Sequence, residues 1–316
     1  MQPKLIRYQS MRVFLTIALY SVLTLLIIPE VTLAQRSDAS QKEQLAVQYY
    51  QNEKYEKALP LFQELFDNKP SSAYLYEYYL NTMLKAEAYE QAISMLRDQT
   101  DRYPEKLTYQ VALGYVQEKQ GESEAAKKTF NAVIDNLPSN PNKVQTIATT
   151  FRNRGKLKYA IKTYKRGREL IGDEEAFSLE VARLYKGLGN EPKAMFQAYL
   201  KAFQADKQAE DIIKKELQQM VMKPAPFQTF KGLLLKTIRA NPEQKRLVDF
   251  LSWLFIQNEA FDEAFVQLKA LQKRLETNGQ RLIELASVAR KNQALSAAEQ
   301  VYRYLVKNDY TDDTDQ

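Results

Sequence analysis

An internal repeat with a period of thirty-four runs through this sequence and leaves few fold classes open. It shows as seven alanines in similar surroundings; the first, Ala58, lies three residues after Tyr55 and four before Phe62. The seven are Ala58, Ala92, Ala126, Ala160, Ala194, Ala264 and Ala298. The first five are evenly spaced (92 − 58 = 34), and the last two have the same spacing (298 − 264 = 34). The 70 residues from Ala194 to Ala264 equal two repeats plus two, which puts Phe230 in the alanine slot of an irregular sixth repeat. Such a period predicts a solenoid of stacked units.

Each repeat has the pattern of two helices joined by a short turn. Apolar residues recur at spacings of three and four, which is the helical period. Proline cannot continue a helix, and it follows the slot by twelve residues in four repeats, at Pro70, Pro104, Pro138 and Pro242. We therefore expect an all-α fold, a right-handed superhelical solenoid of about eight helix–turn–helix units. The expected units lie near residues 39–72, 73–106, 107–140, 141–174, 175–208, 209–244 (irregular), 245–278 and 279–312.

These repeats resemble the tetratricopeptide repeat (TPR) family, over nearly all of the chain that follows residues 1–34. The resemblance rests on Leu45, Ala46, Tyr49, Ala58, Phe62, Leu65 and Pro70 in the first repeat, on Leu113, Gly114, Ala126, Phe130, Val133 and Pro138 in the third, and on Ala182, Tyr185, Ala194 and Ala198 in the fifth. It implies a groove lined by the first helix of every unit. It does not extend to the family's Lys/Asn/Arg clamp for acidic C-terminal tails, because Glu43 and Val47, or Glu77 and Asn81, stand at the clamp positions.

The segment 1–34 has the features of a secretory signal peptide. Basic residues precede an apolar run from Val13 to Ile28, Pro29 follows, and Thr32-Leu33-Ala34 supplies small residues for cleavage before Gln35. The competing interpretation is an uncleaved anchor, although the 16-residue run is shorter than the roughly 20 residues that span a bilayer. We expect an exported bacterial protein, periplasmic or associated with the cell envelope, with a short linker at 35–38 and an acidic tail at 313–316.

Composition excludes several kinds of chemistry. The chain has no Cys and no His, so it has no disulfide, no thiolate and no imidazole to act as nucleophile, general base or metal ligand. The net charge is +6, of which the segment 1–34 carries +2, leaving 6 − 2 = +4, too little to suggest a nucleic-acid partner. We find no catalytic motif and expect no cofactor and no metal. A membrane contact is expected only through the signal segment, if it is uncleaved.

Two groups of residues are candidates for partner binding. Tyr50, Tyr74 and Tyr78 exceed the aromatic residues that the repeat core needs, and we expect them to project from first helices into the groove; the alternative is a wedge or plain surface role. The segment from Lys143 to Arg168 holds nine basic residues and no acidic one. Most of these lie on the solvated face of a second helix, Lys158 and Lys165 among them. Three cations on first helices are the exception and form a possible basic strip in the groove: Arg152, Arg183 and Lys186.

Two interpretations of the basic strip stay open: it binds an acidic part of the partner, or its cations pair with the nearby Glu174, Glu175 and Glu180. The function expected is that of a non-enzymatic scaffold that binds a protein or peptide partner in the cell envelope. The alternatives are a structural subunit of an envelope export or assembly complex, or the N-terminal regulatory part of a longer protein. The sequence does not identify the partner or the oligomeric state.

Overall fold

The structure is a computed structural model that describes residues 39–275 and 278–310. The expected signal peptide at 1–34, the linker at 35–38 and the acidic tail at 313–316 lie outside the described residues. All regular secondary structure in the described residues is helical, as the repeat predicts. The chain divides into two compact units, with the boundary between Val133 and Ile134.

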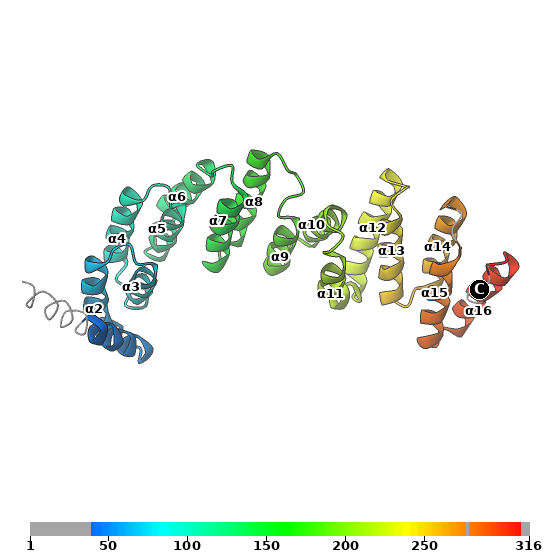
Figure 1. The fold of residues 1–316 in the computed structure, drawn as a ribbon, viewed down its shortest axis with the longest axis horizontal. Helices are drawn as coiled ribbons and strands as arrows, with labels where there is room; N and C mark the ends of the chain where they lie inside the picture. Colours follow the sequence, from blue (N-terminus) through cyan, green and yellow to red (C-terminus); the bar gives the residue numbers. More distant parts are fainter. Residues whose placement is uncertain (1–38, 276–277, 311–316) are drawn as a thin grey trace, which may run out of the picture. The chain divides into compact units, whose positions relative to one another are not determined.

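The first unit is built from a helix at 39–51 followed by five further helices (Figure 1). These are α2 (Tyr55–Asn68), α3 (Ala73–Lys85), α4 (Tyr89–Arg102), α5 (Leu107–Lys119) and α6 (Ser123–Asp135), whose last two residues belong to the second unit. Each of α2, α3 and α4 packs on the helix that follows it. The core between them is continuous and combines the slot alanines with larger side chains such as Phe62, Leu80 and Leu96, all fully buried.

The second unit continues the same arrangement of helix pairs. Its helices are α7 (Pro141–Asn153), α8 (Leu157–Ile171), α9 (Ser178–Leu188), α10 (Pro192–Ala205), α11 (Glu210–Val221), α12 (Pro224–Ala240), α13 (Lys245–Gln257), α14 (Phe261–Leu275), α15 (Gln280–Lys291) and α16 (Leu295–Lys307). The pairs α7–α8, α9–α10, α13–α14 and α15–α16 pack within themselves, and α8, α12 and α14 each pack on the first helix of the next pair. The chain is therefore an all-α repeat; the right-handed superhelix stays a prediction.

A left-handed residue between the two helices of a pair repeats with the same period. Positive φ angles occur at evenly spaced positions (87 − 53 = 34), namely Glu53, Glu87, Gly121, Gly155 and Gly189, and again at Glu259 and Gln293. The backbone turns sharply there, so that the second helix runs back along the first. Glycine adopts this conformation without strain, whereas the Cβ of a glutamate costs about 1–2 kcal/mol. The turn geometry is thus imposed by the repeat and not by glycine alone.

Most slot alanines are buried, as their spacing predicts. Ala58, Ala92, Ala160 and Ala264 have no exposed surface, because the two helices of a pair approach each other closely there. Ala194 is the exception and is half-exposed. The second helices α2, α4, α6 and α8 begin exactly one repeat apart, but α10 begins 192 − 157 = 35 residues after α8. This one-residue shift moves the buried slot to Met195, which is 3% exposed.

The sixth pair, α11 and α12, departs furthest from the repeat, as the sequence predicts. Phe230 on α12 is fully buried and stacks on Phe196 of α10, with ring centroids 4.9 Å apart. It also meets Phe250 of α13 edge-on at 5.3 Å. In this part of the chain α10 packs more extensively on α12 than on α11, the helix that directly follows it. The result is a place in the second unit where the regular order of contacts is broken.

Candidate functional site

Three tyrosines on first helices form one aromatic surface in the first unit, here called the tyrosine surface. Its members are Tyr50, near the end of helix 39–51, and Tyr74 and Tyr78 on α3. The ring of Tyr78 lies 5.3 Å from that of Tyr50 and 4.8 Å from that of Tyr74, between centroids. Beneath them, the buried Phe62 of α2 stacks on Tyr78 at 5.2 Å. The structure therefore brings together the three tyrosines that the sequence singled out.

Tyr74 is the exposed member of the tyrosine surface, with 48% of its area accessible, whereas Tyr50 and Tyr78 are half-buried. Burial raises the pKa of Tyr50, and the neighbouring Tyr55 and Tyr78 raise it further. Burial also raises the pKa of Tyr74, with added contributions from Tyr78 and Glu43. Both phenols consequently stay protonated at neutral pH. The surface offers apolar ring faces for packing together with phenolic O–H groups that donate hydrogen bonds.

The predicted basic strip is not a set of free cations. Arg183, on α9, donates to the carboxylate of Glu216 on α11, from Nη2 at 2.6 Å and from Nε at 2.9 Å. Lys186 donates to the backbone carbonyl of the same glutamate at 3.0 Å. Arg152 lies against the side chain of its neighbour Asn153 at 3.4 Å. The ion pair of Arg183 is thus made with Glu216, not with Glu174, Glu175 or Glu180. A partner-binding role of the strip stays a prediction.

Glu216 holds three helices of the second unit together. Its other carboxylate oxygen accepts a hydrogen bond from the phenol of Tyr199 on α10 at 2.7 Å. Burial alone would raise the pKa of Glu216, but the hydrogen bonds from Arg183 and Tyr199 and the charges of Arg183 and Lys186 outweigh it and lower that pKa. Burial and the bond to this carboxylate in turn raise the pKa of Tyr199. The first-helix cations of this region therefore serve packing between α9, α10 and α11.

The tyrosine surface belongs to the first unit, whereas Arg152, Arg183 and Lys186 belong to the second. The groove that the resemblance implies, lined by the first helix of every unit, would join the two groups on one continuous inner surface. That continuity stays a prediction.

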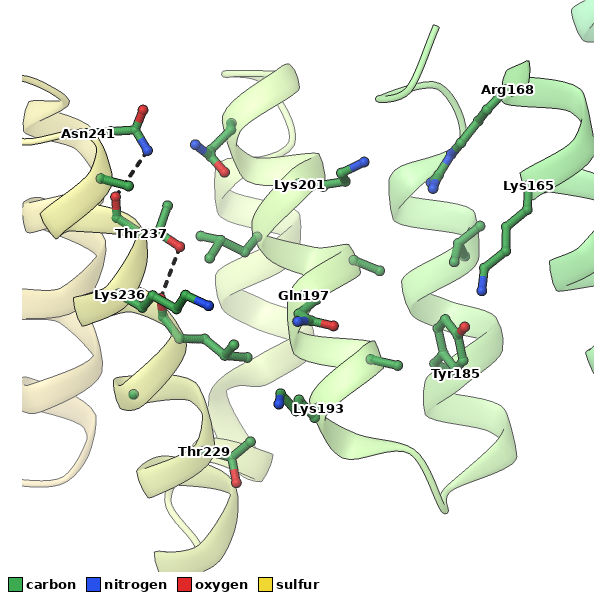
Figure 2. Close-up of a pocket in the computed structure, with 18 residues that line it drawn as sticks. Lys165, Arg168, Tyr185, Lys193, Gln197, Lys201, Thr229, Lys236, Thr237 and Asn241 are labelled. Carbon is green, nitrogen blue, oxygen red and sulfur yellow. Dashed lines mark hydrogen bonds between the residues drawn. The ribbon is translucent and has the colours of Figure 1, made fainter. Parts of the chain in front are cut away.

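A concave site that the sequence did not reveal lies in the second unit, across the exposed side of α10 (Figure 2). We call it the basic cleft. Its volume is about 790 Å³, and its walls come from α8, α9 and α12. Figure 2 shows Lys193, Gln197 and Lys201 along α10, with Lys236 of α12 on one side and Lys165 of α8 on the other. With Arg168, five of its 18 lining residues are cationic, and none is acidic.

The cations of the basic cleft are held to different degrees. Arg168 is 9% exposed, and its guanidinium donates to the Ala176 carbonyl at 2.7 Å and to the Ser178 hydroxyl at 3.1 Å. It is a structural anchor of the cleft wall. Lys165 lies over the ring of Tyr185, 5.8 Å from its centroid. It is exposed, as the sequence predicts, and it also forms part of the lining of the cleft.

The other three lysines are more loosely engaged. The ammonium of Lys201 lies 3.6 Å from a carboxylate oxygen of Glu174, in a pair whose side chains are 46% and 77% exposed. Such exposed pairs contribute little. Lys193 and Lys236 are exposed and make no ion pair or side-chain hydrogen bond within the described part of the chain.

The basic cleft follows from the irregular part of the repeat. The one-residue shift before α10 brings Ala194 to the surface, where it lines the cleft beside Ala198. A signal for the site existed in the sequence, because second helices carry Lys165, Lys201 and Lys236 at separations of 201 − 165 = 36 and 236 − 201 = 35 residues. These separations are close to the repeat period. Spacing alone does not separate these lysines from the solvated lysines of other second helices, because that distinction depends on how α10 and α12 pack.

The described residues offer neither a metal centre nor a membrane span. Their Asp and Glu side chains do not gather in any group of three or more that could hold a metal ion. None of the helices over residues 39–275 and 278–310 is long and apolar enough to cross a membrane.

Comparisons with known proteins give one family model and several similar solved structures. The family model of the tetratricopeptide repeat matches residues 81–141. No curated protein matches the sequence. Three similar solved structures are the C-terminal part of a TPR repeat-containing protein from Cytophaga hutchinsonii, the TPR domain of P58(IPK), and a tetratricopeptide repeat protein from Parabacteroides merdae.

The identities to these three structures are 16%, 14% and 12%, and the TM-scores 0.30, 0.26 and 0.27. The matches cover 85%, 84% and 78% of this chain and 96%, 92% and 92% of theirs. Likeness at this level says nothing about function. The family model match agrees with the helix pairs and with the left-handed turn that returns in every regular repeat. Residues 81–141 therefore match the tetratricopeptide repeat family, and the helix pairs on both sides of this segment follow the same repeat.

Proposed function

We propose that this chain is an exported, non-enzymatic scaffold of the cell envelope that binds a protein segment at the tyrosine surface. The observation that carries the proposal is the packing of Tyr50 and Tyr78 on the buried Phe62, which holds the rings in place while Tyr74 stays 48% exposed. Aromatic side chains held in this way provide contact area at a low cost in conformational entropy. They are also the residues that most often dominate binding energy at protein interfaces.

The chemistry of the tyrosine surface suits an extended protein segment with apolar side chains. Such side chains pack on the ring faces, while the protonated phenol of Tyr50 donates a hydrogen bond to a backbone carbonyl of the segment. A stack of helix pairs presents a long surface, which fits an extended ligand better than a small molecule.

Export is the second part of the proposal and has its own test. The basic start, the apolar run from Val13 to Ile28 and the small residues before Gln35 support a cleaved signal peptide. N-terminal sequencing of the protein purified from its native host is expected to give Gln35 as the first residue. A protein that still begins at Met1 or Met11 contradicts cleavage.

Site-specific photo-crosslinking in the native host tests the binding site. A benzophenone amino acid replaces Tyr74 in one variant and Tyr302 of α16 in a matched control, because Tyr302 is also an exposed tyrosine, with 38% of its area accessible. We expect a discrete adduct with one protein from position 74, and we expect it to weaken when Tyr78 is also changed to Ala. The same set of adducts from both positions, or no adduct from position 74, contradicts the proposal.

A further inference from the structure

The basic cleft places several cations in one hollow without a counter-charge among its lining residues. Like charges at close range repel, and a recess lined by one sign of charge concentrates ions of the opposite sign. The described residues neutralise the cations of the cleft only in part. Lys201 forms a solvent-exposed ion pair with Glu174, while Lys193 and Lys236 have no partner among the described residues. The cleft is therefore arranged to receive an anionic ligand.

The distribution of the cations indicates how the negative charge of the ligand is arranged. Lys165, Lys193 and Lys236 come from three different helices, α8, α10 and α12, and surround the cleft (Figure 2). A lysine ammonium is a point charge on a flexible stem and does not impose the planar two-bond geometry of arginine. This arrangement matches a ligand that carries several separated negative charges, and matches a single small anion less well.

The remaining lining favours a protein segment over a sulfated or phosphorylated polymer. Between the cations the surface is aliphatic, with Ala194, Ala198 and Leu233. Gln197 stands at the centre of this surface, and its amide is exposed and makes no hydrogen bond to another of the described residues. A side-chain amide both donates and accepts hydrogen bonds, so it pairs with a peptide backbone. Acidic side chains, apolar side chains and backbone amides are found together in a polypeptide.

We propose that the basic cleft binds an acidic protein segment, with carboxylates against Lys193 and Lys236 and peptide backbone against Gln197. This is a second site, in another unit and on other helices than the tyrosine surface, so it stands independently of the function proposed above. It is also lined mainly by second helices, whereas the sequence predicts binding on the first-helix face.

Fluorescence anisotropy with defined peptides tests this site on the full protein from the native host. The probe is a fluorescein-labelled peptide of alternating Glu and Ala, and its control has Gln in place of Glu. We expect the Glu peptide to bind, the Gln peptide not to bind, and the affinity for the Glu peptide to fall as salt rises, because partly exposed charges are screened.

The two variants compared carry the same change of net charge. The first variant changes two lysines of the cleft, Lys193→Glu and Lys236→Glu. The second changes two exposed lysines of α8 and α11 outside the lining, Lys158→Glu and Lys215→Glu. Reversal in the cleft is expected to weaken binding of the Glu peptide about tenfold, and reversal outside it by no more than about twofold. Because all four lysines are exposed, both variants should keep the helical content and melting temperature of the wild type.

Three results would overturn the proposal. The first is an equal loss of affinity in both variants, which indicates unspecific attraction by net charge. The second is equal binding of the Glu and Gln peptides. The third is binding of a sulfated glycan, such as heparin, to the cleft while the Glu peptide does not bind, which assigns the cleft to a polysaccharide.

Discussion

Gly114 of α5 lies so close to α6 that no side chain fits there. A Cβ at this position would come within 2.5 Å of the ring of Phe130, which is 1% exposed, so the ring would have to shift within the core. We expect Gly114→Ala to lower the free energy of unfolding by about 1–3 kcal/mol through overpacking. Urea unfolding followed by circular dichroism measures the change.

Gly232 of α12 provides the matched control, because a Cβ there meets no atom within 4 Å. Glycine inside a helix is less favourable than alanine by about 0.5–1 kcal/mol, so Gly232→Ala should stabilise the protein by a similar amount. If the two substitutions shift stability in the same direction, the close packing of α5 on α6 is not as described.

Individual residues were predictable where the repeat is regular. Gly114 and Phe130 both belong to the pattern that pointed to the family, and the structure places them against each other. Ala194 was not predictable in the same way, because its spacing in sequence is regular and only the start of α10 reveals the shift to Met195. A periodic pattern places residues along the chain, but the burial of each one depends on where its helix begins.

The turn between paired helices makes a prediction that does not involve packing. Glu87 has a positive φ of 55°, is exposed, and occupies the turn position that Gly121 occupies in the next pair. Glu87→Gly removes the strain of a Cβ in the left-handed region and should raise the free energy of unfolding by about 1 kcal/mol. Gly121→Ala should lower it by about the same amount. Chemical denaturation of the two variants beside the wild type measures both, and no change in either would show that this turn is not left-handed.

The contact of Glu216 with α9 and α10 should make stability depend on pH. The folded protein holds the pKa of Glu216 below its ordinary value of 4.5. The ionised carboxylate therefore stabilises the folded protein at any pH above 4.5, and this contribution is lost as the pH falls through the lowered pKa. At pH 7, Glu216→Gln should reduce stability by about 1 kcal/mol, a modest amount because Arg183 is half-exposed. The difference from the wild type should vanish in strong acid.

Glu299 is the control for this pH dependence. Its pair with Arg303 lies within α16, and the two side chains are 61% and 78% exposed, so Glu299→Gln should change stability little at any pH. Melting temperatures of both variants across the acidic range test the difference. A Glu216→Gln effect of equal size at neutral and at strongly acidic pH would contradict the role of the ionised carboxylate.

The helices themselves were largely predictable from the sequence, whereas the partners of the basic side chains were not. Spacing and proline placement indicate where a helix pair begins and ends, because these are local properties of the chain. The partner of Arg183 is Glu216, 33 residues away on a helix of the irregular pair. Spacing along the sequence points only to nearby glutamates and gives no signal for this partner. The basic cleft was missed for a related reason, since it arises from a departure from the repeat that only the folded helices show.

For the molecule as a whole, the two proposed binding sites belong to different units, whose boundary lies between Val133 and Ile134. The tyrosine surface uses first helices of the first unit, and the basic cleft uses mainly second helices of the second unit. The two sites can therefore be altered separately. Substitutions in the cleft should leave the crosslink from position 74 unchanged, and this separation can be checked with the Lys193→Glu and Lys236→Glu variant.

Calorimetry decides whether the tyrosine surface is a binding site. It measures the affinity between this protein and the protein segment that is crosslinked at position 74. Tyr74→Ala is compared with Tyr302→Ala, the same change at another exposed tyrosine. Loss of a true anchor at an interface costs about 1–2 kcal/mol, so Tyr74→Ala is expected to weaken binding about tenfold while Tyr302→Ala leaves it unchanged. Unchanged affinity for Tyr74→Ala, or an equal loss in both variants, would contradict the proposal that this chain holds its partner at the tyrosine surface.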